Sequence, residues 1–130
     1  MNVIVDTAIW SEALRRKDPN TEITNSLTEL IQEHRVIFLG PIRQELLSGI
    51  SDQPKFKILR DKLSFFPDKA IITDDYILAA EYSNLCRKKG IQGSHIDFLI
   101  CACSTRMKAT IFTTDKDFLN YKKIIPIILH

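Results

Sequence analysis

Three aspartates lie where a strand ends or a helix begins, and together they could hold a cation. Asp6 follows the β-branched run 2–5. Asp115 follows the apolar run 110–113, and Asp97 lies near the start of a long apolar helix. In an open α/β sheet, ligands bind outside the carboxyl ends of the strands. If these carboxylates converge within about 4 Å, each pair repels by roughly 4 kcal/mol, so the cluster would require a cation.

A fourth acid, Glu45, could join this cluster. It lies beside the apolar stripe of an expected helix rather than opposite to it. Carboxylates without a nearby His or Cys pair suit a hard, oxygen-seeking ion such as Mg²⁺ or Mn²⁺. The pattern therefore indicates a metal site suited to phosphate chemistry.

Each acid also has a purely structural interpretation. Asp6 could cap the helix that follows it, and Glu45 could be a solvated helix residue. Asp97 could belong to a capping box that begins at Ser94. Asp117 fits a second box with Thr114, and capping is its preferred interpretation. Three acids at strand exits and helix entries of one small sheet together favour the site.

Strands that alternate with helices must position these acids. The periodicity predicts strands at residues 2–5, 36–39, 70–72, 110–113 and 124–129. It predicts helices at residues 8–17, 21–34, 41–49, from about 55, 73–89, 94–107 and briefly near 115. Thr73 or Asp74 is expected to cap the fifth helix. Alternation predicts an α/β fold, a mostly parallel four- or five-stranded sheet covered on both faces.

The composition excludes several classes of protein. With 130 residues and no Gly/Pro/Ser-rich linker, the chain is expected to form one domain, residues 1–130. No apolar run approaches the length of a membrane span, and the N-terminus does not resemble a signal peptide, so we expect a cytoplasmic location. Three cysteines are an odd number and lack zinc-ligand spacing, which favours buried free thiols. The net charge of +2 neither requires nor excludes nucleic acid.

Four segments, in this order and spacing, resemble the PIN-domain ribonucleases, and within them the VapC-type toxins of toxin-antitoxin pairs. The segments are Val3–Thr7, Pro41–Leu47, Asp97–Ala102 and Thr113–Phe118. The resemblance covers nearly the whole chain and implies a PIN-like three-layer α/β/α fold. One departure is Met107-Lys108, where relatives commonly end the buried helix with glycine.

The resemblance also implies roles for individual residues. Asp6, Asp97 and Asp115 are similar to the family's metal-binding acids, and Glu45 joins them as a catalytic acid. The hydroxyls of Thr7 and Thr113 are expected to support them, and Asp117 resembles a variable further acid. The implied activity is Mg²⁺- or Mn²⁺-dependent endoribonuclease cleavage that leaves a 5′-phosphate and a 3′-hydroxyl. The implied assembly is a homodimer that is silenced by a small antitoxin protein.

Basic residues are candidates for holding the RNA backbone. They are Arg15 and Arg16 at the end of the first helix and Arg43 near Glu45. Two other functions compete with the nuclease. One is a catalytically silent PIN-like module that only binds RNA. The other is a receiver-like phosphoacceptor domain, which would need paired acids after the first strand, whereas Asp6 stands alone.

Overall fold

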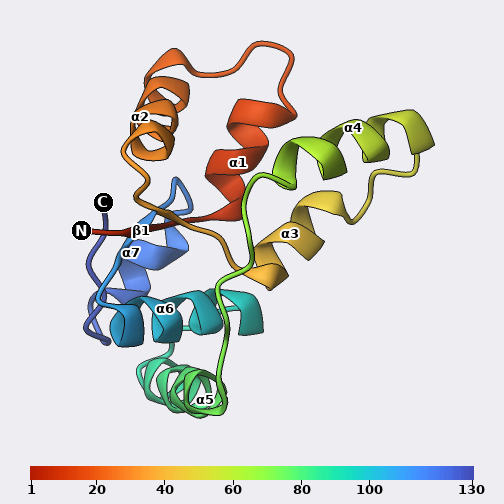
Figure 1. The fold of residues 1–130 in the computed structure, drawn as a ribbon. Helices are drawn as coiled ribbons and strands as arrows, with labels where there is room; N and C mark the ends of the chain where they lie inside the picture. The colour runs from red at the N-terminus through yellow and green to blue at the C-terminus, as the bar shows by residue number, and fades with distance from the viewer.

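A computed structural model describes residues 1–130, and a small parallel sheet lies at its centre (Figure 1). The strands are β1 (Val3–Val5), β2 (Val36–Ile37) and β3 (Thr110–Phe112), in the order β2-β1-β3. Both pairings are parallel, and Ile4 pairs with Ile37 on one side and with Ile111 on the other. All three residues of β1 are fully buried. A strand covered on both faces is expected to be a continuous apolar run, as β1 is.

The sheet has fewer full strands than the four or five expected. Its two edges are extended by single bridges, Phe38 with Asp68 and Ile111 with Leu129. The expected strand 70–72 is absent because the Ala70 carbonyl accepts from Arg106 and the Ile72 N–H donates to Asp75.

The expected strand 124–129 is also reduced to its bridge at Leu129. The N–H groups of Ile124 and Ile125 turn back to the Tyr121 carbonyl, and Pro126 has no N–H to donate.

Seven helices surround the sheet. They are α1 (Thr7–Leu14), α2 (Thr21–Gln32), α3 (Gly40–Leu47), α4 (Gln53–Leu63), α5 (Thr73–Lys88), α6 (His95–Met107) and α7 (Asp117–Tyr121). The helix α1 ends at Leu14, three residues before the expected Lys17, so Arg15 caps its C-terminus. The N-cap of α5 is Ile72 rather than Thr73 or Asp74.

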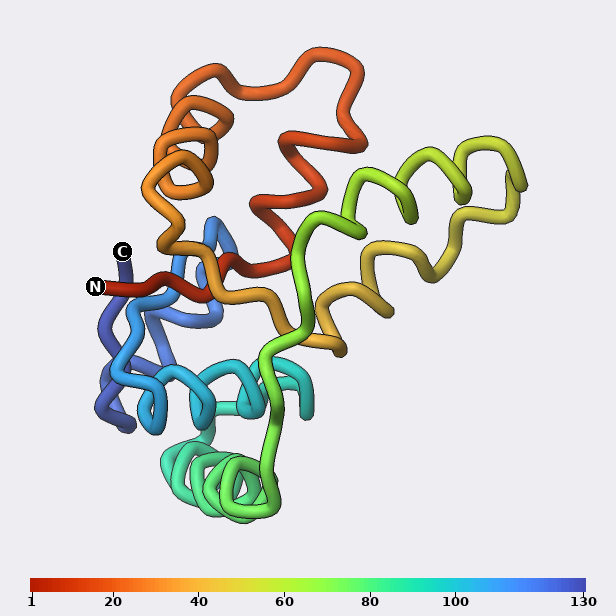
Figure 2. Tube along the Cα trace, in the orientation of Figure 1, coloured from red at the N-terminus to blue at the C-terminus, as the bar shows by residue number.

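The helices form layers on the two sides of the sheet, which confirms the three-layer α/β/α fold class. In Figure 1, α1 and α2 lie on one side and α6 lies on the other, with α5 outside it. The trace in Figure 2 shows that α3 and α4 form a hairpin that projects from one side. The apolar α6 contacts β1, β3 and α5, which explains why seven consecutive residues, 98–104, are buried. No helix combines the length and apolar character that a membrane span needs.

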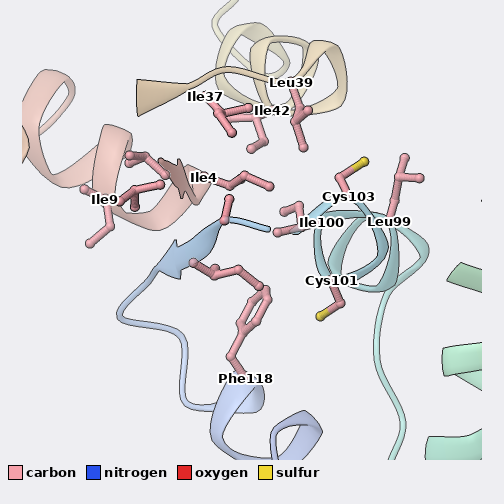
Figure 3. Close-up of a cluster of buried hydrophobic side chains, with 14 of the residues drawn as sticks. Ile4, Ile9, Ile37, Leu39, Ile42, Leu99, Ile100, Cys101, Cys103 and Phe118 are labelled. Atoms are coloured by element: carbon pink, nitrogen blue, oxygen red, sulfur yellow. The ribbon is translucent and has the colours of Figure 1, made fainter. Parts of the chain in front are cut away.

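The buried face of α6 is the largest contribution of one helix to the core (Figure 3). Ile100 and Cys101 are almost fully buried, and Figure 3 shows that Ile100 points toward the sheet and α3 while Cys101 points away from α3. All three cysteines are free and buried, as predicted. Burial raises the pKa of Cys101, which keeps it a neutral thiol.

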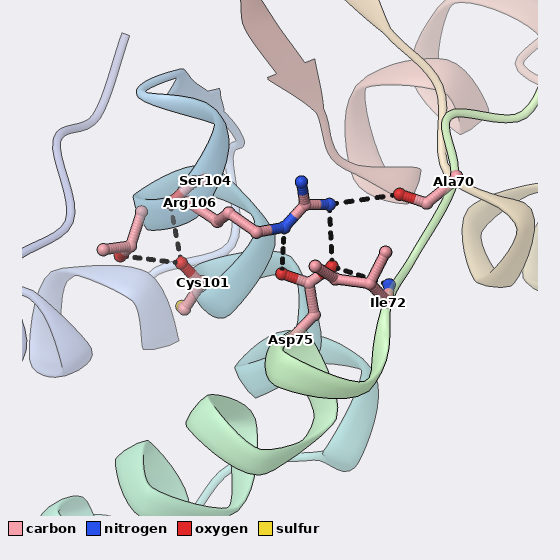
Figure 4. A network of polar contacts seen from close by, with 7 residues as sticks. Ala70, Ile72, Asp75, Cys101, Ser104 and Arg106 are labelled. Carbon is pink, nitrogen blue, oxygen red and sulfur yellow. Dashed lines mark hydrogen bonds and ion pairs between the residues drawn. The ribbon is translucent and has the colours of Figure 1, made fainter.

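A buried ion pair fastens α5 to the C-terminal end of α6 (Figure 4). Arg106 donates to both carboxylate oxygens of Asp75, at 2.6 and 2.8 Å, and to the Ala70 carbonyl at 3.1 Å. The Asp75 side chain is 0% exposed, and it also accepts from the Ile72 N–H at 3.0 Å. The bidentate bond lowers the pKa of Asp75, so the carboxylate stays ionised although it is buried.

The end of α6 has Lys108 where the resemblance leads us to expect glycine. Lys108 caps the helix in the left-handed region, with φ 53° and ψ 45°, and its N–H donates to the Ser104 and Thr105 carbonyls. The turn therefore keeps the geometry of a glycine cap, although a side chain in this region costs roughly 1–2 kcal/mol.

Candidate active site

The sequence-predicted acids meet in one pocket of about 380 Å³ at the carboxyl end of the sheet. Its lining residues are Asp6, Thr7, Ala8, Ser11, Glu45, Ser94, Asp97, Asp115 and Asp117. The strands and helices that supply them are far apart in the sequence. Because β1 and β3 are parallel neighbours, the residues that follow them leave the sheet at the same edge.

Asp6 leaves β1 and is held at both carboxylate oxygens. Its Oδ1 accepts from the backbone N–H of Thr7 at 2.8 Å, so it also caps α1, and its Oδ2 accepts from the Thr113 hydroxyl at 2.7 Å. Burial raises the pKa of Asp6 to about 6, against these two hydrogen bonds, and the charges of Asp97 and Asp115 add to the rise. The ionised form is therefore costly until a cation neutralises it.

Asp97 lies in the first turn of α6, where the buried helix fixes its backbone. The Ser94 hydroxyl accepts from the Asp97 N–H at 3.0 Å, which is half of the expected capping box. The other half is missing because the carboxylate turns to Tyr121, whose hydroxyl donates to Oδ2 at 2.6 Å. Burial raises the pKa of Asp97, and the hydrogen bond from Tyr121 opposes this rise.

Asp115 and Asp117 lie after β3, on the turn that leads into α7. The Thr113 hydroxyl accepts from the Asp115 N–H at 3.0 Å, so one hydroxyl connects Asp6 to Asp115. The Asp115 carboxylate accepts from the Asp117 N–H at 2.9 Å. The expected capping box of Thr114 and Asp117 is wrong, because the N-cap of α7 is Lys116 and Asp115 supplies the carboxylate.

The tightest group of carboxylates differs from the expected trio. One oxygen each from Asp97, Asp115 and Asp117 lie within 4.8 Å of one another. Asp117, expected mainly to cap a helix, therefore belongs to the group. Asp6 borders the same pocket, and each of its carboxylate oxygens accepts one hydrogen bond.

Two further residues of the pocket, Glu45 and Thr7, also have side-chain oxygen atoms. Glu45 is exposed on α3 at the rim. The Thr7 hydroxyl is buried without a hydrogen-bond partner, while the Thr7 backbone N–H supports Asp6. The carboxylates and this unpartnered hydroxyl fit a hard divalent cation, since Mg²⁺ and Mn²⁺ prefer oxygen ligands and neutralise clustered acids.

The basic candidates differ in how available they are. Arg43 is occupied: it pairs with Asp68 at 2.9 Å, donates to the carbonyls of Leu63 and Phe66, and lies over the Phe38 ring. The expectation that Arg43 meets RNA is therefore not retained.

The other two basic candidates lie at the end of α1. Arg16 pairs with Glu12 at 2.7 Å, and its side chain is 70% exposed. Arg15 makes no ion pair and borders a pocket next to the acids.

Two residues that the sequence did not indicate shape the position of Asp97. Tyr121 is fully buried in α7, yet its hydroxyl reaches the site. Gly93 makes this approach possible, because a Cβ at this position would lie 2.4 Å from the Tyr121 hydroxyl. In the sequence Gly93 reads only as a turn residue and Tyr121 as a core aromatic, so no local signal identifies the pair.

Comparison with known proteins agrees with the fold. The family model described as "PIN domain" matches residues 3–124. No curated protein sequence matches the chain significantly.

Three solved structures illustrate the likeness in fold. FitAcB from Neisseria gonorrhoeae has a TM-score of 0.80 at 20% identity, covering 98% of this chain and 95% of that one. VapBC2 from Rickettsia felis, bound to a DNA fragment from its promoter, has a TM-score of 0.82 at 19% identity, covering 100% and 98%. A toxin-antitoxin complex from Klebsiella pneumoniae has a TM-score of 0.67 at 16% identity, covering 90% of both chains. Since the family model spans nearly the whole sequence, the chain belongs to the PIN domain family.

Proposed function

We propose that this protein is a divalent-metal-dependent endoribonuclease, and that it acts as the toxin of a toxin-antitoxin pair. The observation that carries the proposal is the convergence of four aspartates and Glu45 on one pocket. PIN domains are generally nucleases, and this donor set suits their chemistry. The whole chain, residues 1–130, would act as one domain.

Asp97, Asp115 and Asp117 would hold the ion, because their oxygens already lie within 4.8 Å of one another. Asp6 borders the same pocket and would complete the negative charge around it. A bound Mg²⁺ or Mn²⁺ supplies charge stabilisation to the phosphoryl group and lowers the pKa of an attacking water.

The side chains of the chain itself would orient the reacting groups. Tyr121 and Ser94 fix Asp97, and Thr113 fixes Asp6 relative to Asp115. Asp97, held in this way, lines the pocket. Glu45, exposed at the rim, is available to accept a proton from water.

The toxin role rests on the family and on the similar complexes. The similar structure from Klebsiella pneumoniae is a toxin-antitoxin complex, so we infer that an antitoxin protein also binds this chain. Ile72, the N-cap of α5, and Tyr76 and Ile77 of α5 are between 42% and 56% exposed, which supports a protein contact at this helix, such as that of a homodimer. Light scattering of the purified chain with and without a co-expressed antitoxin tests both assemblies.

The decisive experiment compares the wild type with Asp97→Asn on RNA, with Mg²⁺, with Mn²⁺ and with EDTA. The substitution keeps the shape of the side chain and its capacity to accept from Tyr121, but removes the charge. Loss of a group that only orients a metal ligand costs about 10- to 100-fold, so loss of a ligand should reduce cleavage by more than about 100-fold. Asp74→Asn is the matched control, because Asp74 is an exposed aspartate outside the pocket.

The outcomes separate the candidate functions. Metal-dependent cuts with 5′-phosphate ends, lost in Asp97→Asn and kept in Asp74→Asn, support the proposal. RNA that is bound but left intact by the wild type with either metal would favour the silent RNA-binding module instead. Equal cleavage by Asp97→Asn would refute the assignment of Asp97.

A further inference from the structure

A series of three adjoining pockets leads away from the acids along α1. The acid pocket shares Ala8 and Ser11 with a second pocket of about 460 Å³. The second pocket shares Arg15 with a third, of about 480 Å³, between the end of α1 and α4. The shared lining residues place the three recesses next to one another along α1.

The third pocket, which we call the basic groove, carries more positive than negative charge. Its cations are Arg15, Lys55 and Lys62, and none of them takes part in an ion pair. Its only acid is Asp52, whose carboxylate accepts from the Lys55 N–H at 3.0 Å as the N-cap of α4. The three cations and one acid give the groove a net excess of two positive charges.

The arrangement of the basic groove is suited to an extended chain of phosphates. Lys55 and Lys62 are seven residues apart on α4, so they share one face and lie about 10 Å apart along the helix axis. The apolar side chains of Ile58 and Leu59 lie between them, and Ile58 is 56% exposed. A positively charged groove of this kind can follow the phosphate backbone of a single-stranded nucleic acid.

The acids themselves create the need for such a groove. Five carboxylates line the acid pocket, and one divalent ion would offset only two of their charges, so contacts remote from the reacting phosphate would add to the affinity for RNA. Binding energy from remote parts of a substrate can be used to hold the reacting group against an unfavourable environment. The recess beside Ala8, Ser11 and Arg15 lies between the two regions.

We propose that single-stranded RNA runs from the acid pocket over Ala8 and Ser11 into the basic groove, where Arg15, Lys55 and Lys62 bind its phosphates. This inference rests on the proposed function for the identity of the ligand. In this proposal, α4 binds the substrate several nucleotides away from the bond that is cut. Two lysines that the sequence did not indicate, Lys55 and Lys62, take the RNA-binding role that was expected of Arg43.

The test removes two cations from α4 and compares substrates of two lengths. The variant is Lys55→Ala/Lys62→Ala. The control is Lys122→Ala/Lys123→Ala, which removes the same charge from two exposed lysines at the end of α7, outside all three pockets. The substrates are a long single-stranded RNA with a mapped cleavage site and a tetranucleotide around the same bond.

Each phosphate contact on a single strand contributes about 5-fold to affinity at about 0.1 M salt, because log K changes with log salt by about 0.7 per contact. We therefore expect the α4 variant to raise KM on the long RNA by about 10- to 30-fold, with kcat unchanged. The tetranucleotide is too short to reach the groove, so its KM should not change. The control should leave KM unchanged on both substrates.

A binding measurement separates this proposal from the proposed function. In EDTA and in an Asp97→Asn background, the α4 substitutions should reduce the salt slope of RNA binding by about 1.4. This result supports the groove even if the wild type cuts no RNA. If both double variants bind and cut the long RNA alike, the groove proposal is overturned while the nuclease stands. If the α4 variant loses only its protein partner, the groove is a protein contact and the proposal is also overturned.

Discussion

Replacement of Tyr121 by phenylalanine tests whether the aromatic core positions the metal ligands. The hydroxyl of Tyr121 donates to Oδ2 of Asp97 at 2.6 Å, and its ring packs against Phe98 and Phe118. Tyr121→Phe removes one oxygen and leaves these ring contacts. The substitution therefore isolates the hydrogen bond from the packing of α7.

The loss of stability expected in Tyr121→Phe depends on the charge and the exposure of Asp97. A hydrogen bond to a charged group contributes about 1.5–3 kcal/mol, but Asp97 is only half-buried, so water replaces part of the loss. We expect Tyr121→Phe to lower the free energy of unfolding by about 1 kcal/mol at pH 7.5, or about 4 °C in Tm. Loss of an orienting partner should weaken Mn²⁺ binding by about 10-fold.

The direction in which pH changes the Mn²⁺ binding and the stability of Tyr121→Phe follows from the pKa of Asp97. The hydrogen bond from Tyr121 lowers the pKa of Asp97, so its removal raises that pKa further. Mn²⁺ competes with the proton, and the pH midpoint of Mn²⁺ binding should therefore move upward in the variant. The stability difference should become smaller at low pH, where Asp97 is protonated and the hydrogen bond no longer involves a charge.

The assay combines thermal unfolding in EDTA with calorimetric titration of Mn²⁺. Tyr82→Phe is the matched control. The hydroxyl of the buried Tyr82, on α5, lies 2.9 Å from the Thr105 hydroxyl on α6, at the end of α6 far from the acids. Its stability should fall by about 1 kcal/mol and its Mn²⁺ affinity should not change. If Tyr121→Phe behaves like Tyr82→Phe in both measurements, Tyr121 has no positioning role and our reasoning is wrong.

Three further substitutions test how Asp6, Arg106 and Lys108 affect the free energy of unfolding. Asp6→Asn should stabilise the metal-free protein by about 1–3 kcal/mol at pH 7.5, because a carboxyl whose pKa rises from 3.8 to about 6 on folding loses stability as pH increases through that range. Urea unfolding in EDTA should show no difference near pH 4, and a less stable Asp6→Asn at pH 7.5 would contradict the assignment. Arg106→Ala should lower the free energy of unfolding by leaving Asp75 without its charged partner, and the added change Asp75→Asn should restore part of the loss in thermal unfolding. Lys108→Gly should gain about 1 kcal/mol in urea unfolding by relieving the left-handed backbone, whereas an equal gain in Lys108→Ala would argue against this cause.

Local rules in the sequence were sufficient for the fold class and for the position of most acids. A β-branched run such as Val3–Val5 forms a buried strand almost regardless of its neighbours, and the residue after it must leave the sheet at its carboxyl edge. Asp6 and Asp115 were identified for this reason. The long apolar helix identified Asp97 in the same way, because such a helix has to be buried and its first turn then has a fixed place.

The weak edges of the sheet were not determined by the sequence. Segments 70–72 and 124–129 have apolar runs that suit strands, but their backbone groups bond to Arg106, Asp75 and Tyr121 instead. A short run at the edge of a sheet gains little from pairing, so tertiary partners decide its conformation.

The sequence by itself determined which acids could form a site, and the tertiary structure decided how they are held and which cations remain available. Tyr121 and Gly93 serve Asp97 only because α7 folds back onto α6. Arg43 is unavailable because Asp68 and the carbonyls of Leu63 and Phe66 lie beside it. These are contacts between residues distant in the chain. Periodicity and capping report interactions within a few residues, so contacts that arise from packing leave no trace in the local pattern.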